Sequence, residues 1–151
     1  MNKIKIIILI LGLAFSIVGS SFAQDTCENK ANIIKEFYQE YCRVVSDSAK
    51  VTSLITQYCT DELRNALLND LFESSIGGYD YVTNATYEYE LVEKTVSVSK
   101  DGDHYVVNFD RYDPLFELVK ESIIIILDDK GKIAFIKKID PEFGYTIPEV
   151  G

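Results

Sequence analysis

The sequence predicts an α+β domain in which three N-terminal helices pack on one face of an antiparallel sheet of four to five strands. Before the Gly77–Gly78 pair, apolar residues recur at the spacing of a helix. After that pair they alternate with polar residues, and glycine-containing turns separate the alternating runs. Helices and strands are therefore segregated along the chain, which is typical of helices covering one face of an antiparallel sheet.

The length and the N-terminal segment set the boundaries of this domain. The chain has 151 residues without an internal repeat or linker, so one domain is expected over residues 24–151. Residues 1–23 are predicted to be a signal peptide, because Lys3 and Lys5 precede an apolar run that ends in small residues. The run is shorter than the roughly 20 residues of a spanning helix. We expect cleavage after Ala23, no membrane span in the mature protein, and a periplasmic or secreted location.

Apolar residues at helical spacing predict the three helices. The first runs from about Glu28 to Val45, with the apolar residues Ile33, Ile34, Phe37, Tyr38, Tyr41 and Val45. A polar break at residues 46–48 separates it from a second, short helix, whose apolar residues are Val51, Leu54, Ile55 and Tyr58. Thr60 is the expected N-cap of the third helix, which ends within residues 74–78 and carries Leu63, Ala66, Leu67 and Leu71.

Alternation of apolar and polar residues predicts the first strands. The alternating runs begin with residues 87–91, which place Tyr87, Tyr89 and Leu91 on one face, and continue with residues 96–99. Asp101-Gly102 is a strong hairpin signal, and the strand that follows it places Tyr105, Val107 and Phe109 on one face.

The last strands surround a second turn. The apolar run from Ser122 to Leu127 predicts a strand that is covered on both faces, and residues 128–131 turn the chain into a strand with Ile133 and Phe135. If the three helices do not suffice to cover the run from Ile123 to Ile126, a second copy of the chain, in a homodimer, would do so.

Cys27, Cys42 and Cys59 would lie in an oxidising compartment after export, where one disulfide can form. We favour a bridge between Cys42 and Cys59, because these residues lie on consecutive helical segments joined by a short turn. The alternative is that all three thiols are reduced and partly buried.

Several short motifs resemble those of a known family. They are Phe37-Tyr38-x-x-Tyr41, Tyr58-Cys59-Thr60-x-x-Leu63, and Gly78-Tyr79-Asp80-Tyr81 followed by Asn84-Ala85. With the order of elements, they resemble the secreted NTF2-like (cystatin-like) proteins of bacterial envelopes. The resemblance implies a cone in which a curved sheet wraps a long helix, and it implies no particular activity. Tyr81 departs from the family, which often has Pro or a second Asp at this position.

The candidate ligand-binding residues are Asp80, Tyr81, Tyr87, Tyr89 and Arg111. Tyrosine rings offer flat contact area at a pocket mouth, Asp80 offers one fixed charge, and Arg111 has the geometry to hold a ligand carboxylate. The alternative interpretation is structural. The tyrosines would then belong to the core and the sheet edge, and Arg111 would form a solvated ion pair with Asp110, Asp113 or a nearby Glu.

Composition excludes several classes of function. The chain has 24 acidic and 15 basic residues, a formal charge of −9, which disfavours binding to nucleic acid. The lone histidine, His104, follows a turn and is expected to point to solvent, and no residues have the spacing of a metal site. No catalytic constellation and no cofactor motif is present in the sequence.

The leading hypothesis is therefore a non-enzymatic module that binds an unknown small molecule or an envelope protein through the concave face of the sheet. One alternative is a small isomerase or hydratase whose pocket uses an Asp base and a Tyr hydrogen-bond donor. Another is an acidic inhibitor or immunity protein that neutralises a basic partner.

Overall fold

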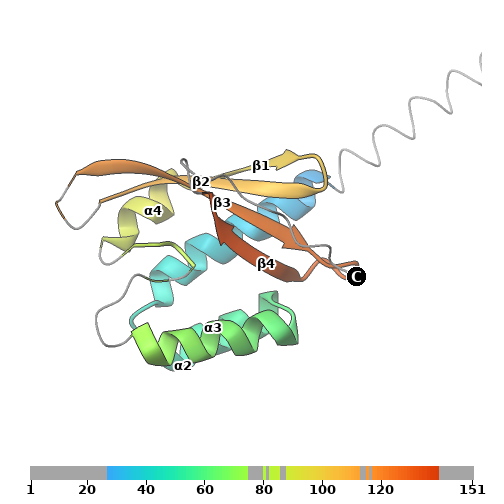
Figure 1. Cartoon of the computed structure of the whole chain (residues 1–151), viewed down its shortest axis with the longest axis horizontal. Coiled ribbons are helices and arrows are strands. Elements are labelled where there is room, and N and C mark those ends of the chain that lie inside the picture. The colour runs from blue at the N-terminus through green and yellow to red at the C-terminus, as the bar shows by residue number, and fades with distance from the viewer. Residues whose placement is uncertain are drawn as a thin grey trace, which may run out of the picture.

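A computed structural model describes residues 27–74, 80, 82–85, 88–112, 115 and 117–139. The predicted signal peptide lies outside these ranges. Helices come first and a four-stranded antiparallel sheet follows, so the predicted α+β class is confirmed (Figure 1). No helix within the described ranges combines the length and the apolar character needed to cross a membrane.

The first three helices are those that the sequence predicts. A helix over residues 27–44, here called the long helix, is followed by α2 (Ser48–Tyr58) and α3 (Asp61–Ser74). Asp47 caps α2, because its Oδ1 accepts a hydrogen bond from the Lys50 amide at 3.2 Å. Thr60 caps α3 in the same way, with its Oγ1 3.4 Å from the Leu63 amide.

A fourth helix corrects one prediction. Residues 89–95 form α4 (Tyr89–Thr95), so the strand predicted over residues 87–91 is wrong. Glu88 has a left-handed φ of 56° and starts the helix, and Lys94 pairs with Glu90 one turn away at 2.7 Å. Val92 and Val96 lie four residues apart and are both buried. Burial of Val92 within the helix, and of its C-cap residue Val96, favours the helix over the short tyrosine–glutamate alternation.

The sheet contains β1 (Ser97–Asp101), β2 (His104–Tyr112), β3 (Leu118–Leu127) and β4 (Ile133–Lys138), paired in that order. Every pairing is antiparallel. Gly102 and Gly131 have φ values of 60° and 79° and make the two predicted turns possible, because other residues rarely adopt such angles.

The core lies between the sheet and the long helix. Tyr105 and Val107 of β2 are opposite Ile125 and Ile123 of β3, and we call the face that carries these four side chains the inner face. It packs on the long helix, where the ring of Tyr38 lies 6.1 Å from that of Phe109. Figure 1 shows the long helix crossing the curved sheet, with α2 and α3 on its other side.

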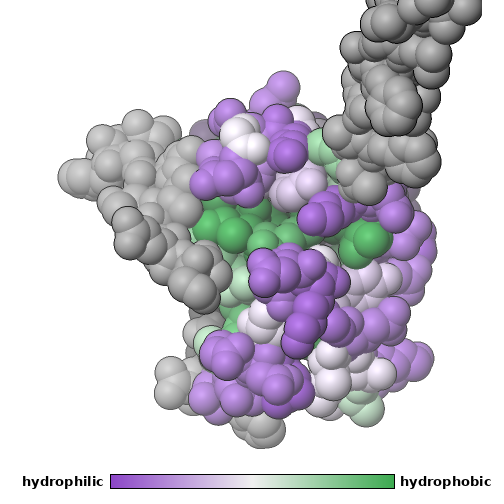
Figure 2. Space-filling model, turned by 90° about the vertical axis from the view of Figure 1, so that its right-hand side faces the viewer, coloured by the Kyte–Doolittle hydropathy of each residue, from purple (hydrophilic) through white to green (hydrophobic). Residues whose placement is uncertain are grey.

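The apolar run of β3 is covered on both faces, as predicted. Ile123 and Ile125 point to the inner face, and Ile124 points to the opposite, outer face. All three have an exposed fraction of 1% or less. Elsewhere apolar side chains reach the surface, as Figure 2 shows on one side of the molecule, where they form a band between two polar regions.

His104 does not point to solvent as expected. Only 6% of this residue is exposed. Its Nδ1 lies 3.1 Å from Oδ1 of Asp103, and its Nε2 lies 3.8 Å from Oδ2 of Asp101. Both carboxylates are themselves largely exposed, so the ring is buried although its acidic neighbours in the turn are not.

The cysteines are present as free thiols, so the structure does not contain the predicted bridge between Cys42 and Cys59. Both residues are buried, and burial raises the pKa of each thiol to about 12. Their surroundings differ: the charges of Asp80 and Glu93 act on Cys42, whereas the charge of Lys132 acts on Cys59.

Candidate functional site

Three of the five candidate residues are described by the structure. They are Asp80, Tyr89 and Arg111, whereas Tyr81 and Tyr87 lie outside the described residues. Asp80 and Arg111 belong to two buried polar clusters, which the loop over residues 82–85 connects.

The first cluster surrounds Asp80, which is 8% exposed. Its Oδ1 accepts hydrogen bonds from the Tyr41 hydroxyl at 2.9 Å and the Val82 amide at 2.8 Å. Its Oδ2 accepts one from the Thr83 hydroxyl at 2.7 Å. Burial raises the pKa of Asp80 above its ordinary value, although these three hydrogen bonds act in the opposite direction. The cluster fastens the loop to the long helix.

Three tyrosine hydroxyls lie near this carboxylate. Burial, and after it the negative charge of Asp80, raises the pKa of Tyr38, Tyr41 and Tyr89, so all three stay protonated. Tyr89 donates to the backbone oxygen of Ala85 at 3.4 Å. The hydroxyl of Tyr38 is buried and has no hydrogen-bond partner within the part of the chain that the structure describes.

The second cluster contains Arg111, whose Nε lies 2.7 Å from Oε2 of Glu121. The two side chains are 8% and 5% exposed, and Asn84 Nδ2 donates to the same Glu121 oxygen at 2.9 Å. The pairing of Arg111 with a nearby Glu was one of the sequence interpretations. It is buried and not solvated, because both residues point to the inner face beneath the loop. The carboxylate that Arg111 holds therefore belongs to the chain itself.

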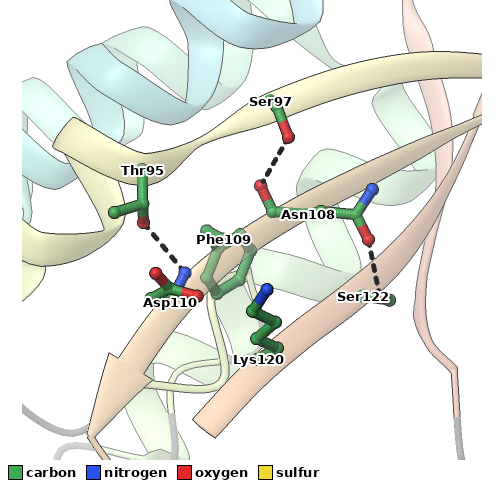
Figure 3. A pocket seen from close by; sticks show the side chains of 7 residues that line it. All are labelled: Thr95, Ser97, Asn108, Phe109, Asp110, Lys120 and Ser122. Atoms are coloured by element: carbon green, nitrogen blue, oxygen red, sulfur yellow. Dashed lines mark hydrogen bonds between the residues drawn. The ribbon is translucent and has the colours of Figure 1, made fainter. Parts of the chain in front are cut away.

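A pocket that the sequence did not reveal lies on the outer face of the sheet. It has a volume of about 270 Å³ and is lined by Thr95, Ser97, Asn108, Phe109, Asp110, Lys120 and Ser122 (Figure 3). In register, Ser97 is opposite Asn108, Asn108 is opposite Ser122, and Asp110 is opposite Lys120. Three neighbouring strands thus place polar side chains side by side.

The hydroxyl groups of this pocket already form hydrogen bonds within the protein. Ser122 Oγ donates to Asn108 Oδ1 at 2.7 Å, and Ser97 Oγ donates to the Asn108 backbone oxygen at 3.3 Å. The Asp110 amide donates to Thr95 Oγ1 at 2.8 Å, which joins the end of α4 to the sheet. These bonds, drawn in Figure 3, fix the orientation of Asn108 and the rim of the pocket.

The remaining polar groups of the pocket have no protein partner among the described residues. They are the Asn108 Nδ2 group, the Asp110 carboxylate and the Lys120 ammonium. Asp110 of β2 and Lys120 of β3 are opposite each other on neighbouring strands, and they do not form an ion pair. The pocket therefore offers an amide donor, one negative charge and one positive charge to a bound molecule.

Sequence reasoning missed this site for a clear reason. Asn108 and Asp110 could be placed on the face opposite Val107 and Phe109 from their alternation. Their alignment with Lys120 and with the other strands depends on strand register, which the sequence alone does not give. Within the described ranges, no three His, Cys, Asp or Glu side chains gather as a metal site would require.

Comparisons with known proteins add information about the fold. Neither a protein-family model nor a curated protein matches the chain. The structure is similar to a crystal structure of a protein of unknown function from Bacteroides thetaiotaomicron VPI-5482, with a TM-score of 0.62 and 20% sequence identity. The similarity covers 81% of this chain and 98% of that one. At this identity the match shows that the two chains share a fold.

Proposed function

We propose that this protein is an exported, non-catalytic binding module of NTF2-like fold that holds a small polar molecule in the outer-face pocket. The proposal rests on three polar groups that line one pocket and have no protein partner among the described residues: the Asn108 Nδ2 group, the Asp110 carboxylate and the Lys120 ammonium. Unpaired, convergent polar groups in a concave site are what a polar ligand requires. The predicted signal peptide, residues 1–23, supports export.

The size of the pocket limits the ligand. A volume of about 270 Å³ equals that of about nine water molecules at roughly 30 Å³ each. It lies just below the range of about 300–1,000 Å³ for drug-sized ligands. A molecule of a few non-hydrogen atoms, able to accept and donate hydrogen bonds, therefore suits the pocket.

The inner clusters suit a structural role better than a binding role. All three hydrogen bonds to the Asp80 carboxylate come from the protein, and Arg111 already holds Glu121. A ligand on the concave face would have to displace these buried contacts. The binding site proposed from the sequence at Asp80 and Arg111 is therefore moved to the outer face of the sheet.

The Asn108 side-chain amide offers a direct test. In NMR spectra of protein expressed from the full-length sequence, a screen of small polar metabolites should shift the Asn108 Nδ2 signals by a saturable amount. Asn108→Asp is the matched variant, because its carboxylate can still accept from Ser122 Oγ but has lost the amide donor. The backbone amides of Asp110 and Lys120 report binding in both proteins, and their shifts should be lost in the variant. Shifts confined to residues away from the pocket would refute the proposal.

One observation favours a second candidate, the Asp/Tyr isomerase or hydratase. Asp80 has a raised pKa and lies among protonated tyrosines, and the hydroxyl of Tyr38 has no partner within the described ranges. A catalytic carboxyl must exchange protons with a substrate. Carbonyl-carbon NMR of Asp80 decides between the two: a titration that responds to an added ketone or enone favours the enzyme, and an unaltered titration favours a structural carboxyl.

A further inference from the structure

We infer that the molecule held in the outer-face pocket is a zwitterion, with an ammonium and a carboxylate close together as in a free α-amino acid. The inference rests on the proposed function and specifies its ligand class. It follows from the two charges in the pocket, Asp110 and Lys120, and from the position of Asn108 beside them.

The two charges occupy directly opposed positions. Asp110 of β2 is the register partner of Lys120 of β3, and both line the same pocket. Opposed residues of neighbouring strands have Cβ atoms about 4.5–5.5 Å apart. Neither charge is used in an ion pair within the described part of the chain, so both are available at a separation that suits one small molecule with two charges.

Other ligand charges fit less well. A simple anion would meet Asp110 in the pocket and the formal charge of −9 around it. A simple cation would meet Lys120, and a neutral sugar would gain no charge–charge contact with either residue. Only a zwitterion pairs each charge of the pocket with one of its own, and it does so without changing the net charge of the complex.

The geometry also assigns an orientation. The ammonium of the ligand lies against the Asp110 carboxylate, and its carboxylate accepts from Lys120 and from Asn108 Nδ2, which Figure 3 shows on the side of Lys120 away from Asp110. Hydrogen bonds between charged groups of this kind are the stronger class in proteins. Ser122 supports the arrangement indirectly, because its bond to Asn108 Oδ1 orients the free Nδ2 group.

The test is an NMR titration of the protein, expressed from its full-length sequence, with four probes. These are L-alanine, N-acetyl-L-alanine, L-alaninamide and methyl α-D-glucopyranoside. L-alanine should shift the amides of Asn108, Asp110 and Lys120 and saturate. Each blocked alanine lacks one charge and should bind at least about tenfold more weakly, a difference of about 1.4 kcal/mol. The glucoside should not shift these amides.

Variants localise the effect. Asp110→Asn and Lys120→Met should each weaken L-alanine binding by about tenfold or more. Asp129→Asn and Lys130→Met make the same changes in the exposed turn before β4 and should leave it unaltered. Binding of the glucoside at the pocket in place of L-alanine would overturn the zwitterion but keep the proposed function. No response at the pocket to L-alanine or to the broader metabolite screen would overturn both.

Discussion

Two tyrosines of the long helix provide a matched pair of substitutions. Tyr38 and Tyr41 both have 0% exposure and lie in the same core. Tyr41 donates a hydrogen bond to Asp80, whereas the hydroxyl of Tyr38 has no partner among the described residues. Replacing either tyrosine by phenylalanine removes one hydroxyl and leaves the ring, so the difference between the two variants measures the hydrogen bond.

Tyr41→Phe should lower the free energy of unfolding by about 1.5 kcal/mol at pH 7. This is the lower end of the range for hydrogen bonds to charged groups, because Val82 and Thr83 still donate to the Asp80 carboxylate. For a domain of this length the midpoint of thermal unfolding should fall by about 6 °C. Tyr38→Phe should cause no loss and should stabilise the fold by up to about 1 kcal/mol, because it removes a buried polar group that has no partner among the described residues.

Urea denaturation of both variants, followed by circular dichroism and analysed at equal m-values, measures these differences. A loss in Tyr38→Phe as large as that in Tyr41→Phe would show that the Tyr38 hydroxyl is bonded in solution. An unaltered stability in Tyr41→Phe would show that the Asp80 cluster does not hold the loop to the long helix. Either result would refute the reasoning for that cluster.

Three further predictions concern the buried polar groups and the thiols. Burial raises the folded-state pKa of Asp80 above its ordinary value of 3.8, so protonation of Asp80 adds to the free energy of unfolding. This contribution is complete below pH 3.8 and is lost as the pH rises through the folded-state pKa. In Asp80→Asn, the free energy of unfolding from urea melts should therefore fall less steeply over this pH range. An equal dependence on pH in both proteins would contradict the raised pKa of Asp80. Arg111→Met should cost about 3–5 kcal/mol, because it leaves the buried Glu121 carboxylate without its cation, and adding Glu121→Leu should recover part of the loss; purely additive losses would argue against the pair. Burial and a pKa of about 12 should protect Cys42 and Cys59 from iodoacetamide at pH 8 until the protein unfolds. If both thiols resist iodoacetamide even in denaturant, and the mass of the protein is two hydrogen atoms lower than that of the reduced chain, the disulfide predicted from the sequence is present.

The fold was largely predictable because its signals are local. Asp47 and Thr60 are capping residues that directly precede helices with apolar residues at helical spacing. Gly102 and Gly131 mark the two turns, each directly after a charged residue. The exception is α4, where the alternation of tyrosine and glutamate favoured a strand. Its helical signal, the spacing of Val92 from the C-cap residue Val96, becomes decisive only when α4 packs against β2.

The sites were less predictable because their contacts are long-range. The sequence places Asp80 as a charge among aromatic residues, but its role depends on Tyr41, which lies 39 positions earlier in the sequence. The sequence indicates Arg111 as a residue able to hold a carboxylate, but only the pairing of β2 with β3 identifies Glu121 as its partner. The outer-face pocket likewise depends on the register that brings Asp110 opposite Lys120.

The most direct test of the central claim is native mass spectrometry of the protein isolated from its own cells without a denaturing step. The account predicts a small-molecule adduct on the unaltered protein and its loss in Asn108→Asp, the variant that removes the amide donor of the pocket. A protein that carries no adduct, or an adduct retained in full by Asn108→Asp, would contradict the claim that the outer-face pocket is the binding site.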